Sequence, residues 1–435
     1  MGRLPLRRAV GATALARGKV HIVGAGMAGL SAAVALAKWG VEVELHESAG
    51  HAGGRCRSYL DPQLNRRIDN GNHLMLSGNH AIQEYLADIG GAGGLTGPDD
   101  AAFPFMDLRT GERWTVRPDR GVIPWSILFG PGRVPGAGLG EYLRACKLVW
   151  AGADATVAAC LAGPGKLYER FWEPMTVGVM NTPADRAAAR PLWQVVKETF
   201  GRGAAACRPL MAREGLSEAL VDPALRYLES RGAAQHFNRR LRSIEWVEGK
   251  AGILRFADDE VPVYRGEAVV LAVSAWVARG LLPDFQGPDT SEAIVNAHFV
   301  LPEPRPGHSL IGLVGGTAQW VFGRNDIASV TVSAAGPLTD EDNARIAELL
   351  WPEVRAALDL DPALPLPAHR IVKEKRATIS QTPDEMRRRP ASRTRWPNLF
   401  LAGDWTETGL PATIQGAVLS GARAARETLD FLSTP

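Results

Sequence analysis

Three glycines near the start of the chain are spaced to bind a dinucleotide. They form the pattern G-x-G-x-x-G between an apolar run, VHIV, and a helix-like stretch, MAGLSAAVALAKWG. In this pattern the first glycine allows a tight turn, the second lets a pyrophosphate approach the backbone, and the third lets the helix pack on the strand. The positive end of that helix faces the phosphates. The first predicted cofactor-binding segment is therefore Gly24, Ala25, Gly26, Met27, Ala28 and Gly29.

An acidic residue ends the next predicted strand. Glu47 follows the run VEVELH and lies eighteen residues after Gly29. A carboxylate at this distance typically accepts a hydrogen bond from a ribose 2′-hydroxyl. Glu47, with the adjacent Ser48, therefore favours an unphosphorylated ribose, as in FAD or NAD, over NADP.

A second glycine-rich turn distinguishes these two cofactors. The segment HAGGRCRSY places Gly53, Gly54 and Arg55 shortly after Glu47. The glycine pair exposes backbone and the guanidinium offers a fixed fork of donors, so this turn suits a second phosphate contact. The turn resembles the GGR element of the flavin amine oxidase and carotenoid desaturase superfamily, in which the arginine lies beside the FAD pyrophosphate. The resemblance implies that FAD is the cofactor.

Three further stretches resemble FAD-binding segments of that superfamily. RIDNGNHLML matches a stretch that meets the isoalloxazine ring, and the β-rich segment from residue 233 to 283 matches one that meets the adenine. The third, NLFLAGDWTETGLPATIQGAVLSGARAARETL, has a helix whose positive end can stabilise a reduced flavin. Superfamily members usually have glutamate where this chain has Gln415. The implied contacts are Gly71, Asn72, His73, Leu74, Leu241, Gly403, Asp404, Ala412, Thr413 and Ile414.

The order of these motifs predicts an α/β fold. A Rossmann-type FAD-binding domain is interleaved with an α+β substrate domain. We expect the FAD-binding domain to comprise residues 19–78, 208–285 and 392–435. Residues 79–207 and 286–391 then form the substrate-binding, membrane-facing domain.

The secondary structure of the substrate domain is less clearly indicated by its sequence. Its first part lacks a pattern of strands separated by turns, and apolar periodicity predicts helices over residues 81–90, 138–162, 167–181 and 187–201. Its second part has strand candidates at 308–316, 318–323 and 327–334. The aromatic segment from residue 120 to 138 has two interpretations, a buried loop or a lipid-facing entrance.

Charge and composition limit the remaining functions. The formal charge of +2 gives no case for nucleic-acid binding, although residues 1–18 form a basic tail and residues 387–395 a basic cluster. Both clusters are either solvated or attracted to an anionic membrane. The four cysteines and nine histidines lack ligand spacing, so no metal site is predicted. No signal peptide or membrane span is apparent, and we expect a cytoplasmic protein, with peripheral attachment to the inner face of the membrane as the alternative.

Five longer motifs narrow the resemblance. DNGNHLMLSGN, FWEPMTVGVMNTP, REGLSEALVDPA, KEKRATISQTP and AGDWTETGLPATIQGAVLSG together resemble the squalene-associated FAD-dependent desaturases, or hydroxysqualene dehydroxylases, over nearly the whole chain from Lys19. The resemblance implies reductive dehydroxylation of hydroxysqualene, a hydrophobic isoprenoid, to squalene in hopanoid biosynthesis. Hydride would pass from N5 of the reduced flavin to an allylic carbon as the hydroxyl leaves.

This chemistry needs a proton donor and a source of electrons. The departing hydroxyl requires a general acid in a dry, apolar pocket, and His73, Glu173 and Glu407 are the candidates. Each also has a structural interpretation, as a hydrogen-bonded interface histidine or as a capping or surface glutamate. No second glycine motif for a nicotinamide cofactor is visible, so we expect an external electron donor.

Three other functions remain open at this stage. A carotenoid or phytoene-type desaturase has the same fold and runs oxidatively, without a proton donor. A flavin amine oxidase usually has aromatic residues before the last helix, where this chain has Gly409, Leu410 and Pro411. A non-enzymatic flavoprotein has no need of the complete set of flavin motifs.

Overall fold

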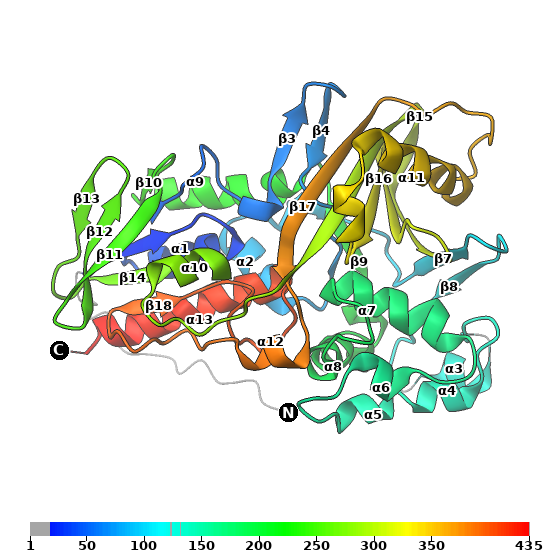
Figure 1. Cartoon of the computed structure of the whole chain (residues 1–435), viewed down its shortest axis with the longest axis horizontal. Helices are drawn as coiled ribbons and strands as arrows, with labels where there is room; N and C mark the ends of the chain where they lie inside the picture. The colour runs from blue at the N-terminus through cyan, green and yellow to red at the C-terminus, as the bar shows by residue number, and fades with distance from the viewer. Residues whose placement is uncertain (1–17, 122–123, 131, 435) are drawn as a thin grey trace.

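The computed structural model describes residues 18–121, 124–130 and 132–434 (Figure 1). The predicted basic tail therefore lies outside the described residues, except for Gly18. A five-stranded parallel sheet has the order β10-β2-β1-β14-β18. Its strands are β1 (Lys19–Val23), β2 (Glu42–His46), β10 (Ala234–His236), β14 (Ala268–Leu271) and β18 (Leu399–Leu401).

Helices and a small antiparallel sheet cover the two faces of this parallel sheet (Figure 1). Helix α1 (Met27–Lys38) lies against α13 (Ile414–Leu432), and a Cβ at Gly421 would lie 2.1 Å from the Ala28 carbonyl oxygen. Only glycine permits so close an approach of two helices. The opposite face carries β11 (Leu241–Val247), β12 (Lys250–Phe256) and β13 (Glu260–Pro262). This arrangement confirms the predicted Rossmann-type α/β class.

A second sheet, with the order β16-β15-β7-β8, forms the other half of the molecule. Its long strands are β15 (Ser291–Val314) and β16 (Trp320–Ser333), and β17 (His369–Ile379) pairs with β15. Helix α11 (Asn343–Ala357) packs on it through fully buried residues such as Leu350. The three strand candidates correspond to parts of two long strands: the first lies largely in β15, and the other two are joined in β16.

The expectation that residues 79–207 lack strands separated by turns is wrong for residues 103–116. Strands β7 (Phe103–Asp107) and β8 (Arg113–Val116) form a hairpin whose first strand pairs in parallel with β15. The chain turns where Gly111 N donates to the Asp107 carbonyl oxygen, and Phe105 and Trp114 are buried behind it. The apolar alternation spans only a few residues and is interrupted by Pro104, which hides it in the sequence.

The helix predicted over residues 138–162 is also wrong as a single element. It is divided into α4 (Leu139–Leu143), α5 (Cys146–Val149) and α6 (Val157–Leu161). Helix α6 begins where the Thr156 hydroxyl accepts from Ala159 N, which is a new N-cap rather than a continuation. The other three predictions correspond to α2 (His80–Asp88), α7 (Glu173–Met180) and α8 (Ala189–Glu198).

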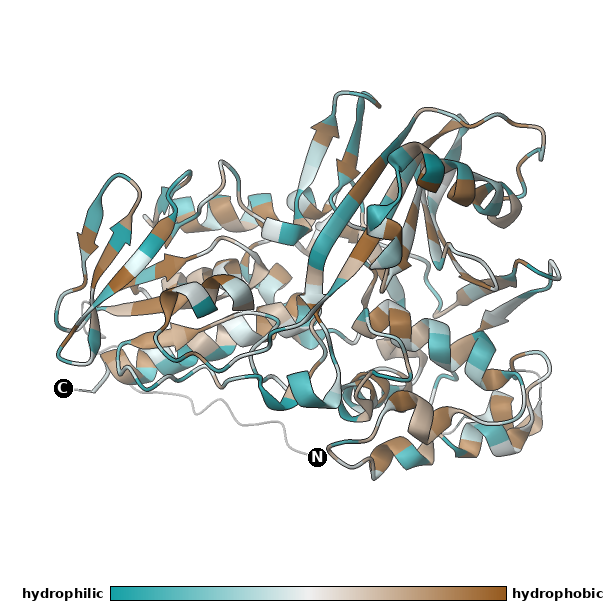
Figure 2. Cartoon of the chain, in the orientation of Figure 1, coloured by the Kyte–Doolittle hydropathy of each residue, from teal (hydrophilic) through white to brown (hydrophobic). Residues whose placement is uncertain are grey.

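The remaining elements are short. Helix α3 (Trp125–Phe129) precedes α4 in the chain, and the helices drawn around it in Figure 2 carry both apolar and polar residues. None of the described helices is long and apolar enough to cross a bilayer. The other bounds are β3 (Ser58–Asp61), β4 (Arg66–Asp69), β5 (Met75–Leu76), β6 (Leu95–Thr96), β9 (Pro209–Ala212), α9 (Asp222–Ser230), α10 (Ala275–Leu281) and α12 (Pro383–Arg387).

Candidate functional site

A cavity of about 630 Å³ opens where the strands of the parallel sheet end. The residue directly after each of β1, β2 and β14 lines the cavity, and so does the second residue after β18. These residues are Gly24, Glu47, Ala272 and Gly403, respectively. Ligands of open α/β sheets bind at this edge. The other wall comes from β15 and β17 of the second sheet, so the cavity lies between the two halves of the molecule.

The glycine turn has the geometry that a pyrophosphate needs. Gly24 has φ +106°, which disfavours any side chain, and a Cβ at Gly29 would lie 1.8 Å from the Gly24 carbonyl oxygen. A Cβ at Gly26 would meet no protein atom within 4 Å, because this residue faces the cavity. Two glycines are thus required by packing, and the third leaves room for a ligand.

Glu47 is held rigidly at the cavity wall. Its Oε2 accepts from Ala25 N at 2.8 Å, and its Oε1 accepts from Ala49 N at 2.8 Å and from Ser48 Oγ at 3.0 Å. The carboxylate is therefore fixed beside the glycine turn, where it suits a ribose hydroxyl.

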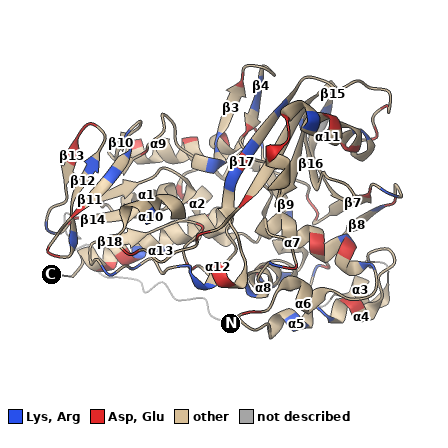
Figure 3. Cartoon of the chain, in the orientation of Figure 1, with Lys and Arg blue, Asp and Glu red and all other residues tan. Residues whose placement is uncertain are grey.

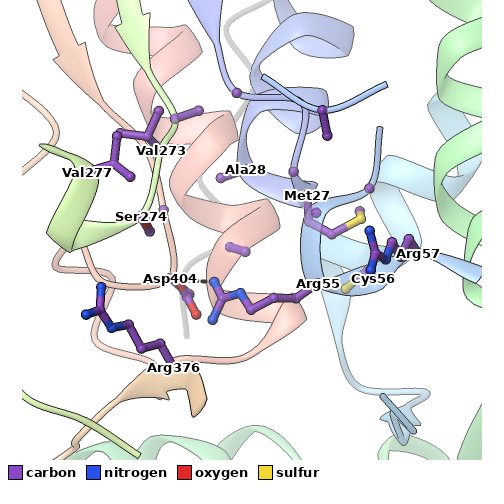
Figure 4. Close-up of a pocket in the computed structure, with 18 of the residues that line it drawn as sticks. Met27, Ala28, Arg55, Cys56, Arg57, Val273, Ser274, Val277, Arg376 and Asp404 are labelled. Atoms are coloured by element: carbon purple, nitrogen blue, oxygen red, sulfur yellow. Dashed lines mark hydrogen bonds and ion pairs between the residues drawn. The ribbon is translucent and has the colours of Figure 1, made fainter. Parts of the chain in front are cut away.

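Arg55 and Asp404 join distant parts of the chain inside the cavity (Figure 4). Arg55 Nη2 donates to Asp404 Oδ1 at 2.9 Å, and Nη1 donates to the Ala377 carbonyl oxygen of β17. Burial alone would lower the pKa of Arg55, but Asp404 raises it above its usual value. The guanidinium therefore stays charged beside Gly53 and Gly54, where a phosphate would be attracted.

The N-terminus of α13 faces the same cavity. Ala412, Thr413 and Ile414 line it, and Thr413 Oγ1 accepts from Gly416 N at 3.2 Å as the N-cap. Gln415 is buried and its Oε1 accepts from Ile82 N, at the start of α2, at 3.1 Å. A neutral amide therefore satisfies the backbone at this position.

Most predicted cofactor residues lie on the cavity wall, but three do not. Ala25, Gly29 and Leu74 belong to the right segments and lie behind the lining residues. The predicted residues that line the cavity are Gly24, Gly26, Met27, Ala28, Glu47, Ser48, Gly53, Gly54, Arg55, Gly71, Asn72, His73, Leu241, Gly403, Asp404, Ala412, Thr413 and Ile414.

The three acid candidates are not brought together. His73 lines the cavity, and burial lowers its pKa to about 4. Glu173 is exposed on α7, where partial burial and then Glu169 raise its pKa. Glu407 is exposed and its Oε1 accepts from Gly409 N at 2.6 Å. Neither glutamate lines the cavity.

The sequence did not reveal which side chains of β15 and β17 line the cavity. The wall that these two strands form is called the second wall. Glu374, Arg376 and Thr378 alternate along β17 and reach the cavity, and Asn296 reaches it from β15. Period-two alternation in KEKRATI is the signal that could have identified them. Among the described residues, no hydrogen bond or ion pair engages the Glu374 carboxylate, whereas Glu47 and Asp404 are both engaged.

The basic cluster at 387–395 is not fully solvated, and its arginines form hydrogen bonds or ion pairs with other residues. Arg389 is only 5% exposed, and its guanidinium donates to the carbonyl oxygens of Asp404, Thr406 and Leu410. It thus shapes the turn that leads to α13. The other arginines of the cluster, Arg387, Arg388, Arg393 and Arg395, form ion pairs with carboxylates. Acidic and basic residues are mixed in this way over the molecule (Figure 3).

The fold and the cavity define an FAD-dependent oxidoreductase. The family model described as flavin containing amine oxidoreductase matches residues 27–429. The chain is 42% identical to the hydroxysqualene dehydroxylase of Rhodopseudomonas palustris over 93% of this chain and 97% of that protein. It therefore belongs to the hydroxysqualene dehydroxylase family.

More distant relatives share the fold. The chain is 24% identical to a probable zeta-carotene desaturase of Synechococcus elongatus, over 95% of this chain and 98% of that protein. A structure of putrescine oxidase bound to putrescine superposes with a TM-score of 0.67 at 16% identity, covering 95% of this chain and 99% of that one.

Proposed function

We propose that this chain removes the hydroxyl group of hydroxysqualene and releases squalene and water. The observation that carries the proposal is the full-length identity of 42% to a hydroxysqualene dehydroxylase, against 24% to a carotene desaturase. The desaturase remains the alternative, because both share the flavin framework. A flavin amine oxidase is the second alternative, and Gly409, Leu410 and Pro411 offer it no aromatic cage.

The cavity wall that contains the predicted cofactor residues is called the FAD-side wall. Its residues support binding of FAD along the whole length of the cofactor. We assign Gly26 and Arg55 to the pyrophosphate, Glu47 to the ribose, and the backbone of Leu241 to the adenine. Residues 71–73 and the N-terminus of α13 then face the isoalloxazine ring. When bound and reduced, FAD supplies the hydride, and the chain supplies orientation, exclusion of water and a proton.

The proton must come from a group that faces the reacting carbon. His73 is on the wall, but its lowered pKa makes the imidazole neutral at pH 7, which weakens it as an acid. Glu374 is the wall carboxyl with no partner among the described residues. We therefore propose Glu374 and His73 as the candidate proton donors. We propose that Glu173 and Glu407 take no part in the reaction.

A membrane surface is the proposed source of the isoprenoid substrate. Between residues 125 and 150 lies an aromatic patch of exposed apolar side chains, and Phe129 and Trp150 are 78% and 79% exposed. Residues 120–150 carry four basic residues and one acidic residue, which suits an anionic surface. The patch comprises Trp125, Leu128, Phe129, Leu143, Val149 and Trp150 on α3, α4 and α5.

The electrons are proposed to come from an external donor. The described cavity contains one dinucleotide-binding turn, and its second wall carries no glycine motif. A tight, stoichiometric site for NADPH would contradict this proposal.

A product assay tests the function. Chemically reduced enzyme is incubated with hydroxysqualene without oxygen, and the products are identified by mass spectrometry. We expect squalene. Formation of a polyene from phytoene or squalene by the oxidised enzyme, with no squalene from hydroxysqualene, would instead support the desaturase.

A further inference from the structure

A cluster of ionisable side chains lies beneath the β11–β13 sheet. Strand register places His21 beside Glu44, and His236 beside His46. Alternate residues of a strand point to the same face, so all four side chains share one face of the sheet. His46 also packs against Phe256 of β12 at 4.8 Å between ring centroids. The histidine cluster comprises His21 on β1, Glu44 and His46 on β2, and His236 on β10.

The donor atoms of this cluster converge. The donor atoms of His21, Glu44 and His46 lie within 4.8 Å of one another. His21 Nδ1 lies 3.3 Å from Glu44 Oε2, and His236 Nε2 lies 2.9 Å from Glu44 Oε1. Bonds of about 2.0–2.2 Å from imidazole nitrogen and carboxylate oxygen to Zn²⁺ span such separations after small side-chain rotations.

One buried nitrogen of the cluster has no partner in the described part of the chain, and two others face only the Glu44 carboxylate. Among the described residues, none forms a hydrogen bond or ion pair with His46 Nε2, whereas His21 Nδ1 and His236 Nε2 lie at ion-pair distance from Glu44 without hydrogen-bond geometry. His21 and His46 are 1% and 0% exposed, and buried polar atoms are normally paired. Burial lowers the pKa of His46 to about 3 and also lowers that of His21. A cation bound between these rings and Glu44 would give His46 Nε2 a partner and would be shared by the two nitrogens that face the carboxylate.

The other nitrogen of His21 is already oriented by the protein. His21 Nε2 lies 3.4 Å from Glu267 Oε2. A carboxylate that accepts from the distal N–H of a ligating histidine fixes its tautomer and leaves the near nitrogen with its lone pair. This arrangement is the usual support of a metal-binding imidazole.

Two cations border the cluster and must be accommodated. Lys19 Nζ lies 3.0 Å from Glu44 Oε2, but it is also 3.4 Å from Glu42 and can remain paired there. Arg239 Nη1 lies 3.3 Å from His46 Nδ1, and this contact must be released when His46 binds a metal through Nε2. Arg239 keeps its ion pair with Asp259 and its stacking over Phe256.

The surrounding charge favours a divalent cation. The histidine cluster and its immediate partners contain four carboxylates against two cations, a net charge of −2 while the imidazoles are neutral. The carboxylates are Glu42, Glu44, Glu267 and Asp259, and the cations are Lys19 and Arg239.

We propose that His21, Glu44 and His46 bind a divalent transition-metal ion, with Zn²⁺ the best match to this nitrogen and oxygen set. His236, with a 37% exposed side chain, completes the coordination and provides the entry route. The sequence predicts no metal site because the ligands come from three strands up to 215 residues apart, so no spacing motif exists.

Metal retention tests this proposal. The untagged, FAD-loaded protein is incubated with Zn²⁺ or Co²⁺, passed through gel filtration at micromolar free metal, and analysed by mass spectrometry and absorbance. We expect one retained Zn²⁺ per chain, and visible Co²⁺ bands of a four-coordinate site. His236→Gln and Glu44→Gln should weaken retention at least tenfold, whereas His80→Gln, an exposed histidine outside the cluster, should not.

FAD content and thermal unfolding are measured for every variant to show that it folds. His236→Gln changes the partly exposed edge of the cluster, so it keeps the test decisive if Glu44→Gln fails to fold. Wild-type protein that retains no metal would overturn the proposal. So would His236→Gln and Glu44→Gln variants that fold and bind Zn²⁺ like the wild type.

Discussion

The two walls of the cavity are built in different ways. The FAD-side wall consists largely of backbone at tight turns, such as those at Gly26 and Gly53, which closely follow the ends of β1 and β2 in the sequence. The opposite wall consists of side chains, among them Asn296 and Glu374, from strands that pair across about eighty residues of sequence. The cofactor turns are therefore recognised from local spacing, whereas the side chains of the opposite wall are placed by long-range strand pairing.

The strongest test of the first wall is the Gly26→Ala variant. Its new Cβ meets no protein atom, so the fold should be unchanged, but the methyl group enters the space assigned to the pyrophosphate. We expect FAD affinity to fall by about 3 kcal/mol, roughly 100-fold. Fluorescence titration of the apoprotein measures it.

The matched control for that variant is Gly280→Ala. Gly280 lies in α10 outside the cavity, and its Cβ would also meet no atom within 4 Å. FAD affinity should stay at the wild-type value there. A Gly26→Ala protein that binds FAD normally would show that this turn is not the pyrophosphate site.

The difference between the walls explains what could be predicted from the sequence. The glycine turn, Glu47 and Arg55 can be recognised in the sequence because each lies at a fixed number of residues from a neighbouring strand or helix. Glu374 and Asn296 are not, because their position depends on the pairing of β15 with β17. The burial of Arg389 could not be predicted for the same reason, since the carbonyl oxygens that surround its guanidinium lie fifteen or more residues away in the sequence.

The second wall is tested by removing its candidate proton donor, Glu374. We expect Glu374→Gln to slow squalene formation about 100-fold in a single turnover, while FAD content is unchanged. His73→Gln tests the candidate on the FAD-side wall in the same assay. Rapid quenching of the reduced enzyme with hydroxysqualene gives the rates.

The exposed glutamates supply the controls. Glu173→Gln and Glu407→Gln should change that rate less than twofold, because neither residue lines the cavity. A large loss in either of these, with Glu374→Gln and His73→Gln unaffected, would move the reaction away from this wall.

The sheet behind the second wall should weaken at acidic pH. His298 is 1% exposed, its Nδ1 lies 2.8 Å from Ser329 Oγ, and burial lowers its pKa to about 4. Between pH 6.5 and 4 the unfolded chain binds a proton that the folded chain does not, so the free energy of unfolding falls as pH falls. We expect a loss of about 2 kcal/mol at pH 5 relative to pH 7 from this residue.

Urea denaturation at both pH values checks this expectation. The His298→Asn variant should lose correspondingly less stability between pH 7 and pH 5 than the wild type. His80→Asn, at an exposed histidine, should behave like the wild type. An identical pH dependence in His298→Asn would show that another group is responsible.

The smallest expected effect concerns the aromatic patch, which lies outside both walls. A Trp125→Ser and Phe129→Ser double variant should bind anionic liposomes about tenfold more weakly, because two exposed aromatic rings no longer enter the interface. Co-sedimentation at low salt measures binding. Trp39→Ser removes a comparably exposed ring, 56% against 53% for Trp125, at the end of α1 and should have no effect. Equal losses in both variants, or no wild-type binding, would contradict membrane docking by this patch.

The central claim is that the cavity couples reduced FAD to removal of a hydroxyl group. The most direct test photoreduces the purified protein without oxygen, adds hydroxysqualene, and follows the oxidised-flavin absorbance together with squalene. We predict one squalene for each flavin reoxidised. A reduced enzyme that stays reduced with hydroxysqualene, while squalene or phytoene bleaches the oxidised form, would contradict the account and identify a desaturase.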